Sequence, residues 1–181
     1  HSVDPHVWFD ISLWSAALAY ASQELQIWQP SWKPQLQANT QSYLQQLDAL
    51  DQRTQAQVQE LVQRNQVLVT AHDAFAYFGK AYGLPVYSLQ GLSTLSEPGL
   101  RDLTELITII QTYQVKAIFA EQTISPKALQ AVARGAAEKN QVVNLAGPLY
   151  TDSLDAPNTP AGTYIGMFET NLQLIYSQLL P

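Results

Sequence analysis

The sequence has no cysteine, and Asp, Glu, Lys and Arg together make up only 13% of its 181 residues. Without thiols the chain can form no disulfide, no thiolate metal site and no cysteine nucleophile. The charge is also one-sided, because 9 Lys and Arg stand against 15 Asp and Glu, which gives a net charge of -6. Such a chain lacks the basic patch that binds a phosphate backbone, so we expect no nucleic-acid partner.

Glycine is sparse as well, with 8 residues, and no phosphate-binding glycine motif follows any predicted strand. The first predicted strand-to-helix junction reads Thr70-Ala71-His72-Asp73 instead, which disfavours a nucleotide or dinucleotide cofactor. The sequence also contains no uncharged apolar run long enough for a membrane-spanning helix. With 46% hydrophobic residues it has the composition of a globular domain with a real core.

The first residues carry neither an initiator Met nor a basic or apolar leader. The chain begins His1-Ser2-Val3-Asp4-Pro5-His6, whereas a secretory signal shows a charged segment followed by an apolar one. We therefore expect this sequence to be a fragment or a processed product, with the native start outside it.

Two helices are predicted in the first third of the sequence. Apolar residues recur every three or four positions from Asp10 to Trp28, and Pro30 closes this helix. A second apolar stripe runs from Trp32 to Asn65 and predicts a helix that spans on the order of 50 Å. Its opposite face is rich in glutamine. A coiled-coil seam is the alternative, but charge pairs for a partner helix are sparse, so we interpret this helix as a strut along a larger protein.

From residue 66 onward, short β-rich runs alternate with helical patterns. This alternation predicts an α/β fold, with a four-stranded parallel sheet flanked by helices. Ser96 ahead of Glu97-Pro98 and Ser125 ahead of Pro126 are predicted to cap two of the helices. The strands are expected at 67–70, 85–89, 117–120 and 142–145, and the helices at about 73–82, 97–113, 126–139 and 161–179.

Polar residues follow three of the predicted strands. In a parallel α/β sheet, ligands bind beyond the carboxyl ends of the strands. His72 follows the first strand, Glu121 the third, and Asp152 lies in the loop after the fourth. His6 is the one other histidine inside the chain. The spacing of these residues matches no local metal-binding motif, so a shared site would have to be assembled by the fold.

Each of these residues also has a purely structural interpretation. A histidine after a strand is commonly a helix cap or a hydrogen-bonded core residue, so His72 by itself is weak evidence for a ligand. Asp152, Asp4 and Asp73 fit Asx turns or helix caps. Glu121 could hydrogen-bond a loop. The four tryptophans lie at helical spacing and not beside basic residues, and we interpret them as core aromatics.

A hydrolase is an alternative function at this point. A zinc hydrolase needs an open coordination position and a free carboxylate base, and the groups for both are available in His6, His72, Asp152 and Glu121. A serine hydrolase has less support, because no serine lies in a Gly-x-Ser-x-Gly segment.

Six short segments, two of them in two parts, stand out along nearly the whole chain. They are DPHVW at 4–8, TAHDAFAYF at 70–78, GLST at 91–94 with EP at 97–98, FAE at 119–121 with SPK at 125–127, LYTDSL at 149–154 and TYIGM at 163–167. In this order they resemble the metal-binding solute-binding proteins of zinc and manganese ABC transporters. Six matches in register are far more specific than any one of them.

The resemblance implies a protein of two lobes joined by one long, rigid helix, with the metal bound between the lobes. It divides the chain into the end of an N-terminal lobe (1–31), the linking helix (32–65) and a C-terminal α/β lobe (66–181). Most of the N-terminal lobe is then missing from the sequence, together with one ligand histidine.

The same resemblance implies that His6, His72 and Asp152 are metal ligands. Two or three imidazoles with one carboxylate favour Zn²⁺, with Mn²⁺ as the alternative. We expect Glu121 to orient a ligand and not to bind the metal itself.

The implied function is that of the solute-binding component of a high-affinity zinc or manganese uptake transporter, which delivers the metal to a membrane permease. Such a component is a periplasmic or extracytoplasmic membrane-anchored lipoprotein and not an enzyme. A metal-dependent hydrolase and a cell-surface adhesin of the same fold are the alternatives. Turnover of ester, phosphate or peptide substrates would reveal the hydrolase.

Overall fold

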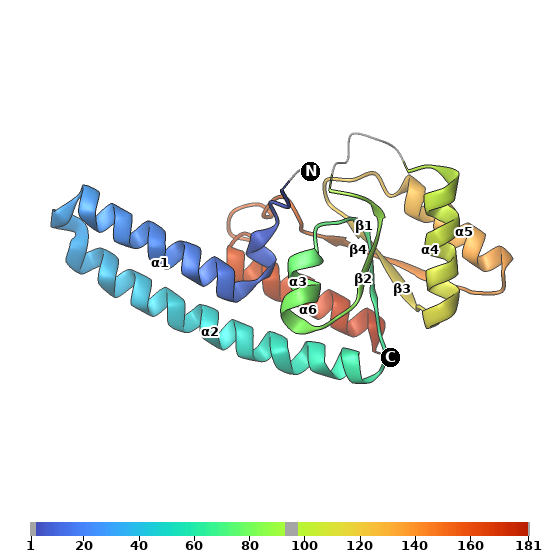
Figure 1. The fold of residues 1–181 in the computed structure, drawn as a ribbon, viewed down its shortest axis with the longest axis horizontal. Helices are drawn as coiled ribbons and strands as arrows, with labels where there is room; N and C mark the ends of the chain where they lie inside the picture. The colour runs from blue at the N-terminus through green and yellow to red at the C-terminus, as the bar shows by residue number, and fades with distance from the viewer. Residues whose placement is uncertain (1–2, 93–97, 181) are drawn as a thin grey trace.

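The computed structural model describes residues 3–92 and 98–180. Its N-terminal part is a helical hairpin, in which α1 (Ile11–Trp28) turns through the 3-10 helix η2 (Pro30–Trp32) into α2 (Lys33–Gln63). A single 3-10 turn, η1 (Val7–Phe9), precedes it. Figure 1 shows α1 lying along the first half of α2, with the tip of the hairpin far from the sheet. Both helices are confirmed within two residues of their predicted ends.

The surroundings of α2 change along its 31 residues, which span about 46 Å at 1.5 Å per residue. Its first half packs against α1, and its second half is buried against the α/β part of the chain. Polar contacts reinforce this packing: the Tyr82 hydroxyl donates to Asp51 Oδ1 at 2.6 Å, and Arg53 pairs with Glu169. The buried side chains of α2 are Leu47, Leu50, Thr54, Val58 and Leu61.

Four parallel strands form the predicted sheet, in the order β2-β1-β3-β4. The strands are β1 (Leu68–His72), β2 (Val86–Gln90), β3 (Ala117–Glu121) and β4 (Asn144–Leu149). The central strand β1 is buried along its whole length, as expected for a strand with neighbours on both sides. β4 lies further along the chain than predicted, because an edge strand tolerates the Gly147-Pro148 pair that usually interrupts a strand.

Helices cover both faces of the sheet, which confirms the α/β class (Figure 1). On the side of α2 lie α3 (Ala76–Tyr82) and α6 (Tyr164–Leu179), and on the other side lie α4 (Leu100–Tyr113) and α5 (Lys127–Glu138). Each face has a hydrophobic core of its own. The first contains Leu61, Phe75, Phe78, Phe119 and Phe168, and the second contains Val69, Ile107, Ile110 and Val132.

Neither of the two predicted helix caps is confirmed. Ser96 lies outside the described residues, as do positions 93, 94 and 97 of the conspicuous segments, and Gly99 takes the N-cap position of α4. The prediction for Ser125 is wrong. Pro126, with helical backbone angles of φ -73° and ψ -2°, occupies the N-cap position of α5 and offers no side-chain acceptor.

The interpretation of all four tryptophans as core aromatics is also wrong. Trp28 is 73% exposed and Trp32 is 48% exposed. They contact each other edge to face at the tip of the hairpin, which lies beyond the reach of both cores. Trp8 and Trp14 are half-buried and do pack against the first core.

The first turn of α6 packs against the loop that precedes it. Thr163 is the N-cap residue, and its hydroxyl oxygen accepts a hydrogen bond from the Gly166 N–H at 3.1 Å. A Cβ on Gly166 would lie only 1.8 Å from the carbonyl oxygen of Pro160. Glycine is therefore required for this close approach, and the loop that it supports is the one that carries Asp152.

Gly166→Ala is expected to destabilise the fold by roughly 1–3 kcal/mol, because the added methyl group must displace the backbone at Pro160. Without this clash, alanine within a helix would stabilise by up to about 1 kcal/mol, so the sign of the change is diagnostic. Urea unfolding measures it. Gly91→Ala is the control, since a Cβ there meets no atom within 4 Å. A Gly166→Ala protein as stable as the wild type would contradict the packing.

Candidate metal centre

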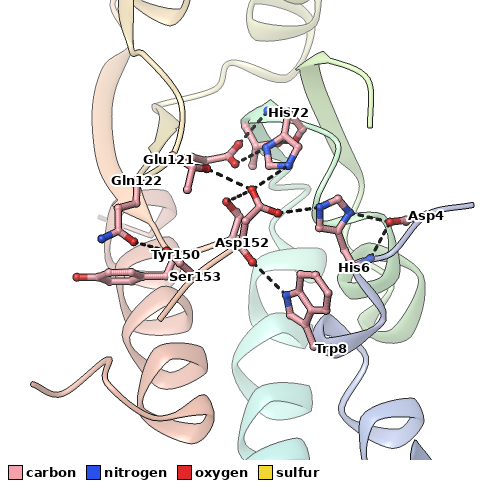
Figure 2. A network of polar contacts seen from close by, with 12 residues as sticks. Asp4, His6, Trp8, His72, Glu121, Gln122, Tyr150, Asp152 and Ser153 are labelled. Carbon is pink, nitrogen blue, oxygen red and sulfur yellow. Dashed lines mark hydrogen bonds and ion pairs between the residues drawn. The ribbon is translucent and has the colours of Figure 1, made fainter. Parts of the chain in front are cut away.

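The carboxyl ends of the strands bring the predicted site residues together. His72 is the last residue of β1, Glu121 is the last residue of β3, and Asp152 follows the end of β4 by three positions. The central strands β1 and β3 are neighbours, so their ends meet at one edge of the sheet. His6, just before η1, joins them from a position 146 residues away from Asp152 (Figure 2).

Three donor groups converge on one point. Ligand atoms of His6, His72 and Asp152 all lie within 4.8 Å of one another. His6 Nε2 is 3.2 Å from Asp152 Oδ1, and His72 Nε2 is 3.7 Å from Asp152 Oδ2. In a tetrahedral zinc site, ligand atoms at the usual bond lengths lie roughly 3.4 Å apart, so small movements suffice to enclose a metal. The donor set is two imidazole nitrogens and one carboxylate.

Glu121 does not share this point, because it is engaged with the far side of the His72 ring. Its Oε1 accepts a hydrogen bond from the His72 backbone N–H at 2.9 Å, and its Oε2 contacts His72 Nδ1. The ring of His72 therefore turns its Nε2 toward Asp152 (Figure 2). These contacts place Glu121 where a residue that orients a ligand would lie, because a carboxylate on the second nitrogen of a metal-ligating histidine fixes its tautomer.

Asp4 holds His6 in the same way, a role that the sequence did not reveal. Its Oδ1 accepts from the His6 backbone N–H at 3.0 Å and lies 2.7 Å from His6 Nδ1. The expected Asx-type turn is thus present, but the same oxygen also orients the ring and leaves Nε2 toward Asp152. The signal that could have found it is the Asp-x-His spacing.

Loop contacts fix the position of Asp152. The Thr123 hydroxyl donates to Asp152 Oδ2 at 3.2 Å, and the neighbouring Ser153 hydroxyl donates to the side-chain oxygen of Gln122 at 3.0 Å. At the start of the loop, the buried side chain of Asn171 bonds both backbone groups of Tyr150. The Asp152 side chain is 40% exposed, whereas the two histidine side chains are 3% exposed or less.

A cavity of about 260 Å³ lies beside Asp152 and is lined by Trp8, Trp14, Leu154 and Tyr164 among others. Larger hollows of about 750 and 460 Å³ flank the α1–α2 hairpin and are lined mainly by glutamine, small and apolar side chains. These hollows contain no histidine of the described part of the chain. The candidate metal ligands therefore lie beside the smaller cavity and not in these larger hollows.

A protein-family model described as "Zinc-uptake complex component A periplasmic" (ZnuA) matches residues 1–178 of the chain. The chain belongs to the ZnuA family. The description names zinc, a metal that imidazole nitrogens and carboxylates bind in proteins.

Relatives of this ZnuA-family chain are known at the level of sequence and of structure. The manganese-binding lipoprotein MntA of Bacillus subtilis is 42% identical over 97% of this chain and 58% of its own length. The zinc-binding protein TroA of Treponema pallidum is 39% identical over 97% of this chain and 57% of its own length. The solved structure of periplasmic TroA matches with a TM-score of 0.93 at 39% identity, covering 98% of this chain and 64% of that one. The chain thus spans somewhat more than half of these curated relatives.

The pH dependence of metal binding is expected to follow His72. Burial lowers the pKa of His72, but its hydrogen bond to Glu121 and the charges of Glu121, Asp152 and Asp73 together outweigh burial, so the pKa is raised above 6.5. A proton on Nε2 excludes a metal there. When the pH is lowered from about 8, zinc affinity should therefore begin to fall before the pH reaches the range in which an ordinary histidine titrates.

Glu121→Gln tests this assignment, because it removes the charge that raises the pKa and should move the fall in affinity to lower pH. Titration calorimetry at several pH values measures both profiles. Glu138→Gln, at an exposed site on α5, is the matched control and should leave the profile unchanged. A wild-type affinity that stays constant down to about pH 6 would contradict the prediction.

Proposed function

We propose that this chain is the larger, C-terminal part of the solute-binding component of a zinc or manganese ABC uptake transporter. The observation that carries the proposal is the convergence of His6, His72 and Asp152 from three distant parts of the sequence. Each buried imidazole has its second nitrogen against a carboxylate, as metal-ligating histidines usually do. The metal is the transported substrate, and the site's task is to bind and release it.

Zinc is the proposed metal, and manganese is the alternative. Two imidazole nitrogens with one carboxylate suit Zn²⁺, whereas Mn²⁺ favours oxygen donors. Both metals occur among the relatives close to 40% identical to this chain, because TroA is named as a zinc-binding protein and MntA as a manganese-binding lipoprotein. Three protein ligands leave further coordination positions, which water or a residue outside this sequence would fill.

The geometry favours transport over hydrolysis. A zinc hydrolase needs a carboxylate that is free to act as the base, and both oxygens of Glu121 are taken up by His72. We therefore propose that the zinc-loaded chain turns over no ester, phosphate or peptide substrate. Sustained turnover that requires both zinc and Glu121 would instead establish the hydrolase.

The proposed assembly follows the division into 1–31, 32–65 and 66–181. In it, residues 1–31 complete an N-terminal lobe, α2 links the lobes, and the metal lies between them. The first half of α2 and the hairpin tip extend well beyond the sheet, which is consistent with a second lobe beside them (Figure 1). The partner that receives the metal would be the membrane permease.

The proposed location is extracytoplasmic, as a periplasmic protein or a membrane-anchored lipoprotein. The family description and the name of MntA support this location. Within the described residues, no helix combines the length and the apolar character that crossing a bilayer requires.

Substituting the ligands tests the proposed function. His72→Ala and Asp152→Ala are each expected to weaken zinc binding by more than roughly tenfold, since each removes a donor that the remaining residues do not replace. Titration calorimetry with Zn²⁺ and with Mn²⁺ gives both the affinity and the preferred metal. Glu138→Ala, which removes an exposed carboxylate far from the site, should bind like the wild type. Wild-type affinity in His72→Ala would refute the proposal.

A further inference from the structure

Trp8 connects the two ligand-bearing segments that do not belong to a strand. It lies two residues after His6, and its indole Nε1–H donates to the carbonyl oxygen of Thr151 at 3.1 Å. Thr151 directly precedes Asp152 and is only 2% exposed. The bond therefore spans 143 residues of sequence and joins the immediate neighbourhoods of two proposed ligands (Figure 2).

A second hydrogen bond holds the backbone of Trp8 itself. The hydroxyl of Tyr164 donates to the Trp8 carbonyl oxygen at 2.8 Å. Tyr164 is the first residue of α6, at the far end of the loop that carries Asp152. Trp8 is thus bonded through its side chain to the beginning of this loop and through its backbone to the end of it. The His6 ring also lies edge-on against the indole, with ring centroids 5.3 Å apart.

The three ligands differ in their need for such a connection. His72 is a strand residue, and the sheet and Glu121 fix its place. His6 and Asp152 lie in loops from opposite ends of the chain, and their 3.2 Å contact depends on how those loops sit against each other. Asp4 orients the His6 ring within its own segment only, because it is a local neighbour.

We propose that Trp8 is a positioning residue for the metal site, which ties the His6 segment to the Asp152 loop through the Thr151 carbonyl and the Tyr164 hydroxyl. It touches no metal in this role. Without these two hydrogen bonds, both ligands are still present but are no longer held in one geometry. The inference rests on the proposed metal-binding function, and the experiment below separates the two.

The test uses Co²⁺ as the probe, because its visible absorption reports the number and arrangement of its ligands, together with Zn²⁺ calorimetry. Trp8→Phe keeps an aromatic ring and removes the N–H donor, and Tyr164→Phe removes only the hydroxyl. Both variants of the 181-residue chain are expected to bind zinc roughly ten- to hundredfold more weakly and to show an altered Co²⁺ spectrum. Urea unfolding midpoints are recorded for each, so that a change in the site is distinguished from a loss of fold.

Trp14→Phe is the matched control. Trp14 lines the same cavity and stacks on Tyr164, with ring centroids 5.5 Å apart, but it forms neither of the two hydrogen bonds that connect the ligand segments. This variant should keep the wild-type affinity and spectrum. Should Trp8→Phe fail to fold, Tyr164→Phe decides the matter on the same readouts.

Two results would overturn the inference while the proposed function stands. One is a wild-type zinc affinity and Co²⁺ spectrum in Trp8→Phe, or in Tyr164→Phe if Trp8→Phe does not fold. The other is an equal loss of zinc affinity in Trp14→Phe, which would point to packing in the cavity. A wild-type chain that binds neither Co²⁺ nor Zn²⁺ would refute the proposed function and this inference together.

Discussion

A carboxylate that is buried away from water must be paired, and among the described residues Glu121 is paired with His72. The Glu121 side chain is 0% exposed, and its two oxygens engage the backbone N–H and the ring of that single residue. An unpaired charge in such a place costs several kcal/mol. The pairing therefore fixes β1 against β3 at their carboxyl ends, and it also sets the direction in which His72 Nε2 points.

The charges of the site follow from that arrangement. Within the described part of the chain, carboxylates at Asp4, Glu121 and Asp152 face two imidazoles, so negative charge is in excess around the point where the donors converge. The raised pKa of His72 expresses the same imbalance, because a proton on the ring offsets part of it. A divalent cation bound at the proposed site would take the place of such a proton. At the proposed site, this excess of negative charge would favour any cation, and the coordination geometry would then discriminate among metals.

Much of the fold and the positions of the site residues could be predicted from sequence, because they depend on local regularities. The spacing of apolar residues located α1, α2 and the strands, and strand ends are where a parallel sheet collects its functional residues. The boundaries of β4 could not be predicted, since Gly147-Pro148 reads as an interruption unless the strand is known to lie at an edge. The exposed Trp28 shows the same limit, because helical spacing does not reveal where a helix runs out of neighbours.

The orienting contacts of the site were harder to predict because they depend on tertiary structure. Asp4 has the sequence signature of a turn, and the turn is present, so nothing local distinguishes its second role at the His6 ring. The partner of Trp8 lies 143 residues away. Such contacts exist only once the His6 segment has docked on the α/β part of the chain.

Phe9 anchors that docking. It is 1% exposed, and its ring stacks on Phe75 with centroids 4.4 Å apart. Burying an aromatic side chain of this size contributes a few kcal/mol, more than a single hydrogen bond at the site can supply. The apolar contact of Phe9 therefore brings His6 to the sheet, and the hydrogen bonds of Asp4 and Trp8 then determine where its nitrogen lies. The residue that attaches the segment to the sheet therefore differs from the residues that set the position of His6 Nε2. A substitution at Asp4 or Trp8 is accordingly expected to change the geometry at His6 without detaching the segment that carries it.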